Sequence, residues 1–133
     1  VNKKLWPTYS FFRIYDRGSD LPIHIDKPSC EYTVALCLGC DPIDKPYEIF
    51  IGEDDKNSSY KYFDSDRNLK PLKIDESFPM KPNNALIFKG MEKLHWREYC
   101  QHDHYITVFL HYQEGDYKDY KFDQRECLGA KKG

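Results

Sequence analysis

The sequence predicts an all-β protein with few or no helices, built as a β-sandwich or barrel. Runs rich in β-branched and aromatic residues recur along the chain, and aromatic residues make up 16% of its 133 residues. Clusters of Pro, Gly, Asn and Asp separate these runs. No stretch of ten or more residues keeps the apolar period of a helix.

The N-terminal part of the chain contains four expected strands. The first is aromatic or β-branched almost throughout, and Pro7 is expected to fix its start because proline cannot donate a ladder hydrogen bond. The second stops at Pro28. The third is nearly continuous in apolar residues, which indicates burial on both faces. These strands are expected over residues 8–15, 21–26, 30–38 and 47–52.

The C-terminal part begins with a polar stretch, residues 53–67, which reads as an exposed hairpin or mobile loop. A lid over substrate is one interpretation of this loop, and a solvated connection is the more common one. Prolines and an Asn-Asn turn over residues 79–84 should separate the next two strands. Further strands are expected over residues 72–74, 85–88, around His95 and over 104–112, with an edge strand over 117–122.

Length and charge restrict the class of protein. The chain fits one domain, residues 1–128, followed by a disordered tail at 129–133, and its first residue, Val1, suggests a fragment or the C-terminal core of a longer protein. A net charge of -2 provides no basic field, so we expect neither nucleic acid nor a membrane as a partner. An odd count of five Cys predicts a reducing, intracellular location, cytoplasmic by expectation.

The pair His24 and Asp26 carries the strongest functional signal. In an extended segment the two side chains point the same way and can share one metal ion. His95 is the best third ligand, because two imidazoles and a carboxylate on one face of an octahedral ion suit a non-haem Fe(II) oxygenase. If the three were unrelated, they would be a turn residue, a cap before Pro28 and a half-buried strand residue.

The order of segments around these residues strengthens the metal hypothesis. A run from Tyr9 to Tyr15 ends in a turn at Gly18 and the ligand pair follows at once; an Asn84–Gly90 block and a final apolar run flank His95. This order resembles the 2-oxoglutarate/Fe(II)-dependent oxygenase superfamily, in particular its prolyl-4-hydroxylase-like branch, from about residue 9 to residue 112. The resemblance implies a double-stranded β-helix, the cupin-like jelly roll, with its usual buttressing helices upstream or absent.

The resemblance also implies an activity. Fe(II) would be held by His24, Asp26 and His95, and decarboxylation of 2-oxoglutarate to succinate would accompany hydroxylation of a substrate C–H bond. The expected substrate is a peptidyl residue, such as a prolyl residue, or a small molecule. Ascorbate is a further expected cofactor. Neither the substrate nor the oligomeric state follows from these residues. Lys27 is expected either at the substrate mouth or, more commonly for a lysine, in solvent.

The sequence departs from the family pattern at the anchor for the far carboxylate of 2-oxoglutarate. The family's basic residue, nine or ten positions after the distal His, falls on His104 or Tyr105, and neither is a reliable cation. A buried carboxylate needs a cation or several donors. Strand alternation places Tyr105 toward the iron side and His104 away from it.

Two arginines can replace the missing cation. Arg97 is two residues after His95, and Arg13 is two residues before Tyr15, which matches a tyrosine that contacts the cosubstrate in prolyl-hydroxylase relatives. We expect Arg97 to pair with the carboxylate and Tyr15 to donate a hydrogen bond, with Arg13 in reserve. Surface arginines paired with neighbouring acids are the alternative.

Two other classes of function remain open at the sequence level. A cupin-type enzyme could hold a metal without using 2-oxoglutarate, and the missing basic residue favours it. A non-catalytic binding module on the same fold is the other alternative, although such a module has no need for three metal ligands.

Overall fold

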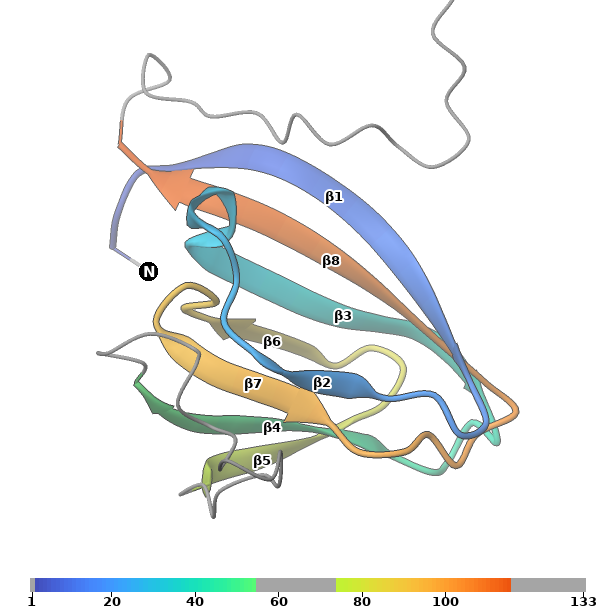
Figure 1. The fold of residues 1–133 in the computed structure, drawn as a ribbon. Coiled ribbons are helices and arrows are strands. Elements are labelled where there is room, and N and C mark those ends of the chain that lie inside the picture. The colour runs from blue at the N-terminus through green and yellow to red at the C-terminus, as the bar shows by residue number, and fades with distance from the viewer. Residues whose placement is uncertain (1, 55–73, 116–133) are drawn as a thin grey trace, which may run out of the picture.

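The computed structural model describes residues 2–54 and 74–115 and confirms the all-β class. Eight strands form two four-stranded antiparallel sheets, and a 3-10 helix at Pro28–Cys30 is the only helix in these ranges (Figure 1). None of the described segments is a helix long and apolar enough to cross a bilayer. The expected edge strand at 117–122, the tail at 129–133 and residues 55–67 of the expected loop lie outside the described residues.

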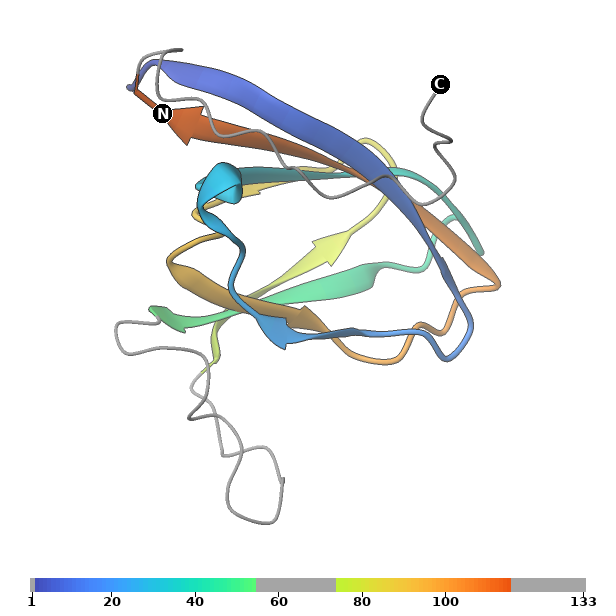
Figure 2. The same ribbon diagram turned by 45° about the horizontal axis from the view of Figure 1, so that its top comes forward.

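The two sheets, here sheet A and sheet B, face each other across the core (Figure 2). Consecutive strands mostly alternate between them. In order across the sheet, sheet A contains β1 (Leu5–Asp16), β8 (His104–Glu114), β3 (Tyr32–Asp41) and β6 (Ala85–Phe88). Sheet B contains β2 (Leu21–His24), β7 (Lys93–Arg97), β4 (Tyr47–Asp54) and β5 (Ile74–Met80).

Two prolines occupy positions that the sequence analysis assigned incorrectly. Pro7 does not begin its strand but lies inside β1, and Pro79 does not separate two strands but lies inside β5. Both strands are sheet edges, where one side of the backbone has no ladder partner and a missing N–H costs little. The β1–β8 register also shifts between Pro7 and Tyr9.

Alternation along β8 shows how the core is filled. Tyr105, Thr107, Phe109 and His111 are all buried and point between the sheets, whereas His104 is exposed. The same period on β1 turns residues 9, 11, 13 and 15 inward, paired with residues 111, 109, 107 and 105 of β8. The space between the sheets is therefore lined by two adjacent rows of aromatic and polar side chains, and the candidate site lies there.

Candidate metal centre

His24 and His95 meet across the β2–β7 pair. They are direct partners in the antiparallel register, and their ring centroids lie 4.2 Å apart. His95 is only 3% exposed, while His24 lies at the end of β2 and is half-buried. The register of one strand pair therefore brings together two imidazoles that are 71 positions apart in the sequence.

The backbone holds both rings in the orientation that a metal ligand needs. Nδ1 of His24 lies 2.7 Å from the carbonyl oxygen of Pro22, and Nδ1 of His95 lies 2.9 Å from that of Lys93. Because a carbonyl only accepts, each Nδ1 carries the proton and donates. Each Nε2 then faces the site. Metal-binding histidines usually have their second nitrogen fixed in this way.

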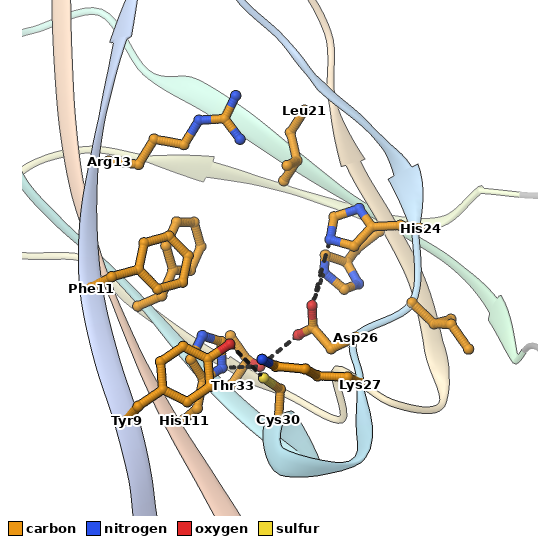
Figure 3. Close-up of a pocket in the computed structure, with 13 residues that line it drawn as sticks. Tyr9, Phe11, Arg13, Leu21, His24, Asp26, Lys27, Cys30, Thr33 and His111 are labelled. Carbon is orange, nitrogen blue, oxygen red and sulfur yellow. Dashed lines mark hydrogen bonds and ion pairs between the residues drawn. The ribbon is translucent and has the colours of Figure 1, made fainter. Parts of the chain in front are cut away.

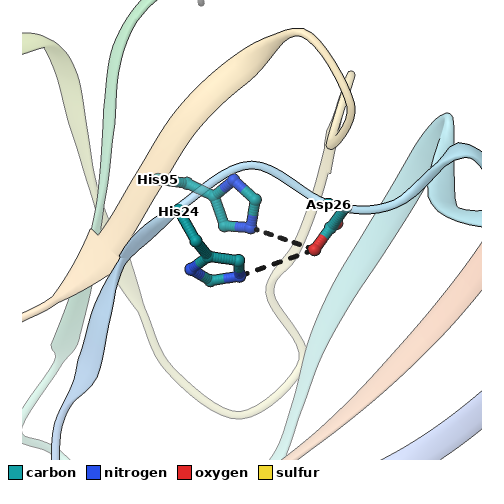
Figure 4. A group of neighbouring side chains, drawn as sticks. All are labelled: His24, Asp26 and His95. Atoms are coloured by element: carbon teal, nitrogen blue, oxygen red, sulfur yellow. Dashed lines mark ion pairs between the residues drawn. The ribbon is translucent and has the colours of Figure 1, made fainter. Parts of the chain in front are cut away.

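Asp26 provides the third ligand from just beyond the end of β2. Its Oδ1 lies 3.5 Å from Nε2 of His24 and 3.6 Å from Nε2 of His95, and the three ligand atoms all lie within 4.8 Å of one another (Figure 4). Neighbouring ligands of an octahedral ion, bound at roughly 2.1 Å, are about 3 Å apart. A small closure of these side chains would suffice to bind one ion.

The electrostatic surroundings keep Asp26 ionised. Burial acts to raise the pKa of its carboxyl group, but the electrostatic interactions with His24 and His95 and the hydrogen bond from Thr33 outweigh burial and hold that pKa well below its usual range. Burial also acts to lower the pKa of His24, yet its contacts with Asp26 and Pro22 raise that pKa overall. The carboxylate is therefore already in the deprotonated form that binds a metal ion.

A second layer of residues fixes Asp26 from the side facing sheet A. The hydroxyl of Thr33 on β3 donates to Oδ2 of Asp26 at 2.8 Å and lies 3.0 Å from Nδ1 of His111 on β8. Since the hydroxyl proton goes to the carboxylate, Nδ1–H of His111 donates to the hydroxyl oxygen. Figure 3 shows this chain of contacts running from His111 through Thr33 to Asp26. Both Thr33 and His111 are buried.

A cavity of about 330 Å³ opens beside the three ligands, at the small end of the range for small-molecule sites. The lining also includes aromatic rings of β1 and β8, two cations and one thiol (Figure 3). Its members other than the three ligands are Tyr9, Phe11, Arg13, Leu21, Ile25, Lys27, Cys30, Thr33, Phe109 and His111. Lys27, which was expected more often in solvent, is therefore a half-buried lining residue.

Arg97 is buried rather than at the surface, with 2% of it exposed. Its Nη1 donates to the carbonyl oxygen of Tyr47 at 2.9 Å, while Nε and Nη2 have no partner among the described residues. The buried hydroxyls of Tyr15 and Tyr105 also make no hydrogen bond within the described ranges. The guanidinium carbon lies 4.6 to 5.6 Å from the ring centroids of these three tyrosines. Arg97 does not line the 330 Å³ cavity.

Arg13 lies on the cavity side of the same cluster. It lines the cavity, donates from Nη2 to the carbonyl oxygen of Asp20 at 3.0 Å, and places its guanidinium 4.5 Å from the ring centroid of Tyr15. Tyr15 thus contacts both arginines, and neither has a carboxylate partner within the described ranges. The three residues expected to bind the cosubstrate come together, but only Arg13 lies in the cavity.

Sequence reasoning missed several residues of this centre. Asp26, Cys30 and His111 form a second group whose ligand atoms lie within 4.8 Å of one another, and the phenol of Tyr9 is 3.1 Å from Sγ of Cys30. Strand alternation from Phe109 could have placed His111 on the inner face. Nothing local in the sequence marks Gly90, which contacts Asp26 from another loop.

Comparison with known proteins identifies no family for this chain. No model of a known protein family matches the chain, and no curated protein has a significantly similar sequence. The functional proposal therefore depends on the residues of the centre itself.

Proposed function

We propose that the protein is an Fe(II)- and 2-oxoglutarate-dependent dioxygenase that hydroxylates a peptidyl residue or a small molecule. The convergence of His24, Asp26 and His95 carries the proposal. Two neutral imidazoles and one carboxylate on one side of an ion leave positions open for other ligands, which is the donor set of non-haem Fe(II) oxygenases. A bound iron would supply the activation of oxygen that amino-acid side chains alone do not provide.

The order of strands supports a double-stranded β-helix as the fold. Strands 1, 3, 6 and 8 belong to sheet A, and strands 2, 4, 5 and 7 belong to sheet B. Eight antiparallel strands distributed between two facing sheets are typical of a jelly roll. In such a fold, ligands from β2 and β7 would meet at the open side of the barrel.

The cluster of unpartnered donors supports a site for the far carboxylate of 2-oxoglutarate. Arg97 is buried, and among the described residues two of its N–H nitrogens and the hydroxyls of Tyr15 and Tyr105 have no hydrogen-bond partner. Leaving a buried donor without an acceptor costs about 1–3 kcal/mol. A carboxylate would accept from several of these groups at once. Arg97 follows His95 by two residues, roughly 7 Å along the strand, which a five-carbon diacid can span.

The protein would position the ion and the cosubstrate and would exclude water. His24, Asp26 and His95 would hold the ion, and Arg97 with Tyr15 would orient the cosubstrate so that its 2-oxo acid end faces the ion. The carbonyl oxygens of Pro22 and Lys93 keep both imidazoles in the tautomer that exposes Nε2. Residues lining the cavity would receive the substrate on the other side of the ion.

Two measurements test this proposal. Succinate formation from 2-oxoglutarate with Fe(II) and ascorbate should be measurable for the unaltered protein and absent in Asp26→Ala. Calorimetry should also measure the binding of 2-oxoglutarate to the metal-loaded protein, because succinate formation is slow when the primary substrate is missing. Metal binding without 2-oxoglutarate binding would favour a cupin-type metalloenzyme, and binding of neither would favour a non-catalytic module.

The same titration identifies the anchor. We expect 2-oxoglutarate binding to be lost in Arg97→Gln and kept in Arg13→Gln. Arg17→Gln, which removes an exposed ion pair with Asp103, is the matched control for loss of a positive charge. The reverse result for Arg97 and Arg13 would assign the anchor to the arginine that lines the cavity. Circular dichroism of Arg97→Gln would show whether the buried substitution keeps the fold.

A further inference from the structure

Four rings of β1 and β8 form one wall of the cavity, and we call them the ring platform: Tyr9, Phe11, Phe109 and His111. The register of β1 and β8 pairs Tyr9 with His111 and Phe11 with Phe109. Ring centroids in these pairs are 4.6 and 5.2 Å apart. The ring planes are inclined by 12° between Tyr9 and Phe11 and by 25° between Phe11 and His111, and by 34° and 33° within the two register pairs. The four rings therefore form one aromatic wall.

Polar contacts fix two rings of the ring platform. The ring of His111 is fixed by its contact with the Thr33 hydroxyl at 3.0 Å, and the Tyr9 phenol lies 3.1 Å from Sγ of Cys30. Phe109 is 6% exposed and supports Phe11. A preorganised surface loses little entropy when a ligand binds to it.

Phe11 is the unusual member of the platform. Its side chain lines the cavity between the sheets, yet 43% of it is exposed. An inward phenylalanine beside polar metal ligands leaves apolar surface that nothing in the described chain covers. Figure 3 shows its ring across the cavity from His24 and Asp26. A ligand lying on Phe11 would be sandwiched between that ring and the metal group.

A cation lies over the neighbouring ring of the platform. Nζ of Lys27 is 4.8 Å from the centroid of Tyr9, and the centroid of Tyr9 is 6.1 Å from that of Phe11. A ring stacked on Phe11 would thus direct a substituent over Tyr9, toward this ammonium. Figure 3 shows Arg13 at the opposite end of the platform, on the side of Leu21. Lys27 is therefore the lining cation on the Tyr9 side of the cavity.

We propose that the cavity binds a small planar aromatic acid, with its ring on Phe11 and its carboxylate paired with Lys27. This inference rests on the proposed function for its substrate role, since the bound ring would face the ion held by His24, Asp26 and His95. Aromatic rings gain from offset stacking on a flat π surface, whereas a puckered saturated ring does not. The volume of about 330 Å³ suits one ring with a short substituent and is small for a folded peptide segment.

Binding of four probes tests the inference: phenylacetate, its uncharged analogue phenylacetamide, the saturated analogue cyclohexylacetate, and a short proline-containing peptide. Saturation-transfer NMR and calorimetry would measure binding to protein loaded with Zn(II) and 2-oxoglutarate, so that no turnover occurs, and to the metal-free protein. Phenylacetate should bind about tenfold more tightly than each of the other three.

Matched variants locate the probe. Phe11→Ala and Phe11→Leu should each weaken phenylacetate about tenfold, the second with a much smaller loss of apolar volume. Phe12→Ala should leave binding unchanged, because Phe12 is the adjacent residue on the outer face of the same strand, 69% exposed. Lys27→Gln should weaken phenylacetate about tenfold and leave phenylacetamide unchanged. Thermal melting would establish that each variant is folded.

Several outcomes overturn the inference. Equal binding of phenylacetate and cyclohexylacetate would exclude stacking, and equal binding of phenylacetamide would exclude the carboxylate contact. Tightest binding of the proline peptide would identify a peptide site instead. If none of the probes binds while 2-oxoglutarate still does, the inference fails and the proposed function stands. If 2-oxoglutarate does not bind but phenylacetate does, in a Phe11-dependent way, the proposed function fails and the ring subsite stands.

Discussion

Gly90 and Asp26 are in such close contact that no side chain fits between them. The backbone N–H of Asp26 donates to the carbonyl oxygen of Gly90 at 2.8 Å. A Cβ at residue 90 would overlap Oδ2 of Asp26 and would also lie 2.7 Å from the Thr33 hydroxyl and 2.8 Å from the Cys30 carbonyl oxygen. The absence of a side chain at Gly90 therefore determines where the carboxylate of Asp26 can lie.

Gly90→Ala should weaken metal binding by about 10- to 100-fold, because the added methyl group pushes Asp26 away from His24 and His95. Overpacking should also cost about 1–3 kcal/mol of stability. Calorimetric titration with Mn(II) measures the first effect and urea unfolding the second. Gly39→Ala is the control, since a Cβ at that position in β3 meets no atom within 4 Å. Unchanged metal affinity in Gly90→Ala would contradict this role.

Thr33→Val should reduce metal affinity about tenfold by removing the hydroxyl that links Asp26 to His111. Thr33→Ser, which keeps the hydroxyl, should restore most of the affinity. Thr107→Val is a matched control: its hydroxyl is also buried but donates to the carbonyl oxygen of Leu36. That variant should lose about 1 kcal/mol of stability without a change in metal affinity. If Thr33→Ser bound metal as weakly as Thr33→Val, the Thr33 hydroxyl would have no role in metal affinity.

Metal ions should stabilise the fold through the three ligands. At a free Mn(II) or Fe(II) concentration of 100 times Kd, the free energy of unfolding should rise by about 2.7 kcal/mol, visible as an increase of several degrees in Tm. Asp26→Ala should abolish this increase. Asp103→Ala, which removes an exposed carboxylate paired with Arg17, should keep it. An equal increase in both variants would place the ion elsewhere.

The tyrosines around Arg97 predict a loss of stability at high pH. Burial raises the pKa of the Tyr105 hydroxyl far above its usual value, despite the opposing effect of Arg97. Burial likewise raises the pKa of Tyr15 and Tyr47. The unfolded chain therefore releases these protons first, so stability is complete below pH of about 10 and falls as pH rises further.

Tyr105→Phe tests this pH dependence. The variant should flatten the slope of unfolding free energy against pH by up to about 1.4 kcal/mol per pH unit above pH of roughly 10. It should cost little at neutral pH, because the Tyr105 hydroxyl has no partner in the described part of the chain. Urea unfolding of both proteins between pH of about 8 and about 11, a range that includes the ordinary tyrosine pKa, measures this difference in slope. An unchanged slope would show that this hydroxyl ionises freely in the folded protein.

Strand positions could be predicted from the sequence because runs of β-branched and aromatic residues coincide with strands in the described ranges. The first run was expected over residues 8–15 and β1 covers Leu5–Asp16. The two prolines inside strands were misassigned because their tolerance depends on which strands are sheet edges. Edge position is a property of the whole topology, which local sequence does not encode.

The candidate ligands could be proposed from spacing and resemblance, and the structure brings all three together. The contacts that Thr33 and Gly90 make with Asp26, and the link from His111 through Thr33, could not be proposed, because they arise from tertiary packing. Strand alternation predicts that Arg13 and Arg97 face the space between the sheets, but it does not predict how deeply each side chain is buried. Only the packing of three tyrosines separates the buried arginine from the one lining the cavity.

Anaerobic calorimetry of Fe(II) and 2-oxoglutarate tests the central claim most directly. The account predicts one Fe(II) per chain, one 2-oxoglutarate that binds only after the metal, and loss of both in His95→Ala and Asp26→Ala but not in His104→Ala, whose exposed imidazole pairs with Asp16. Retention of metal-dependent 2-oxoglutarate binding in His95→Ala and Asp26→Ala would contradict it.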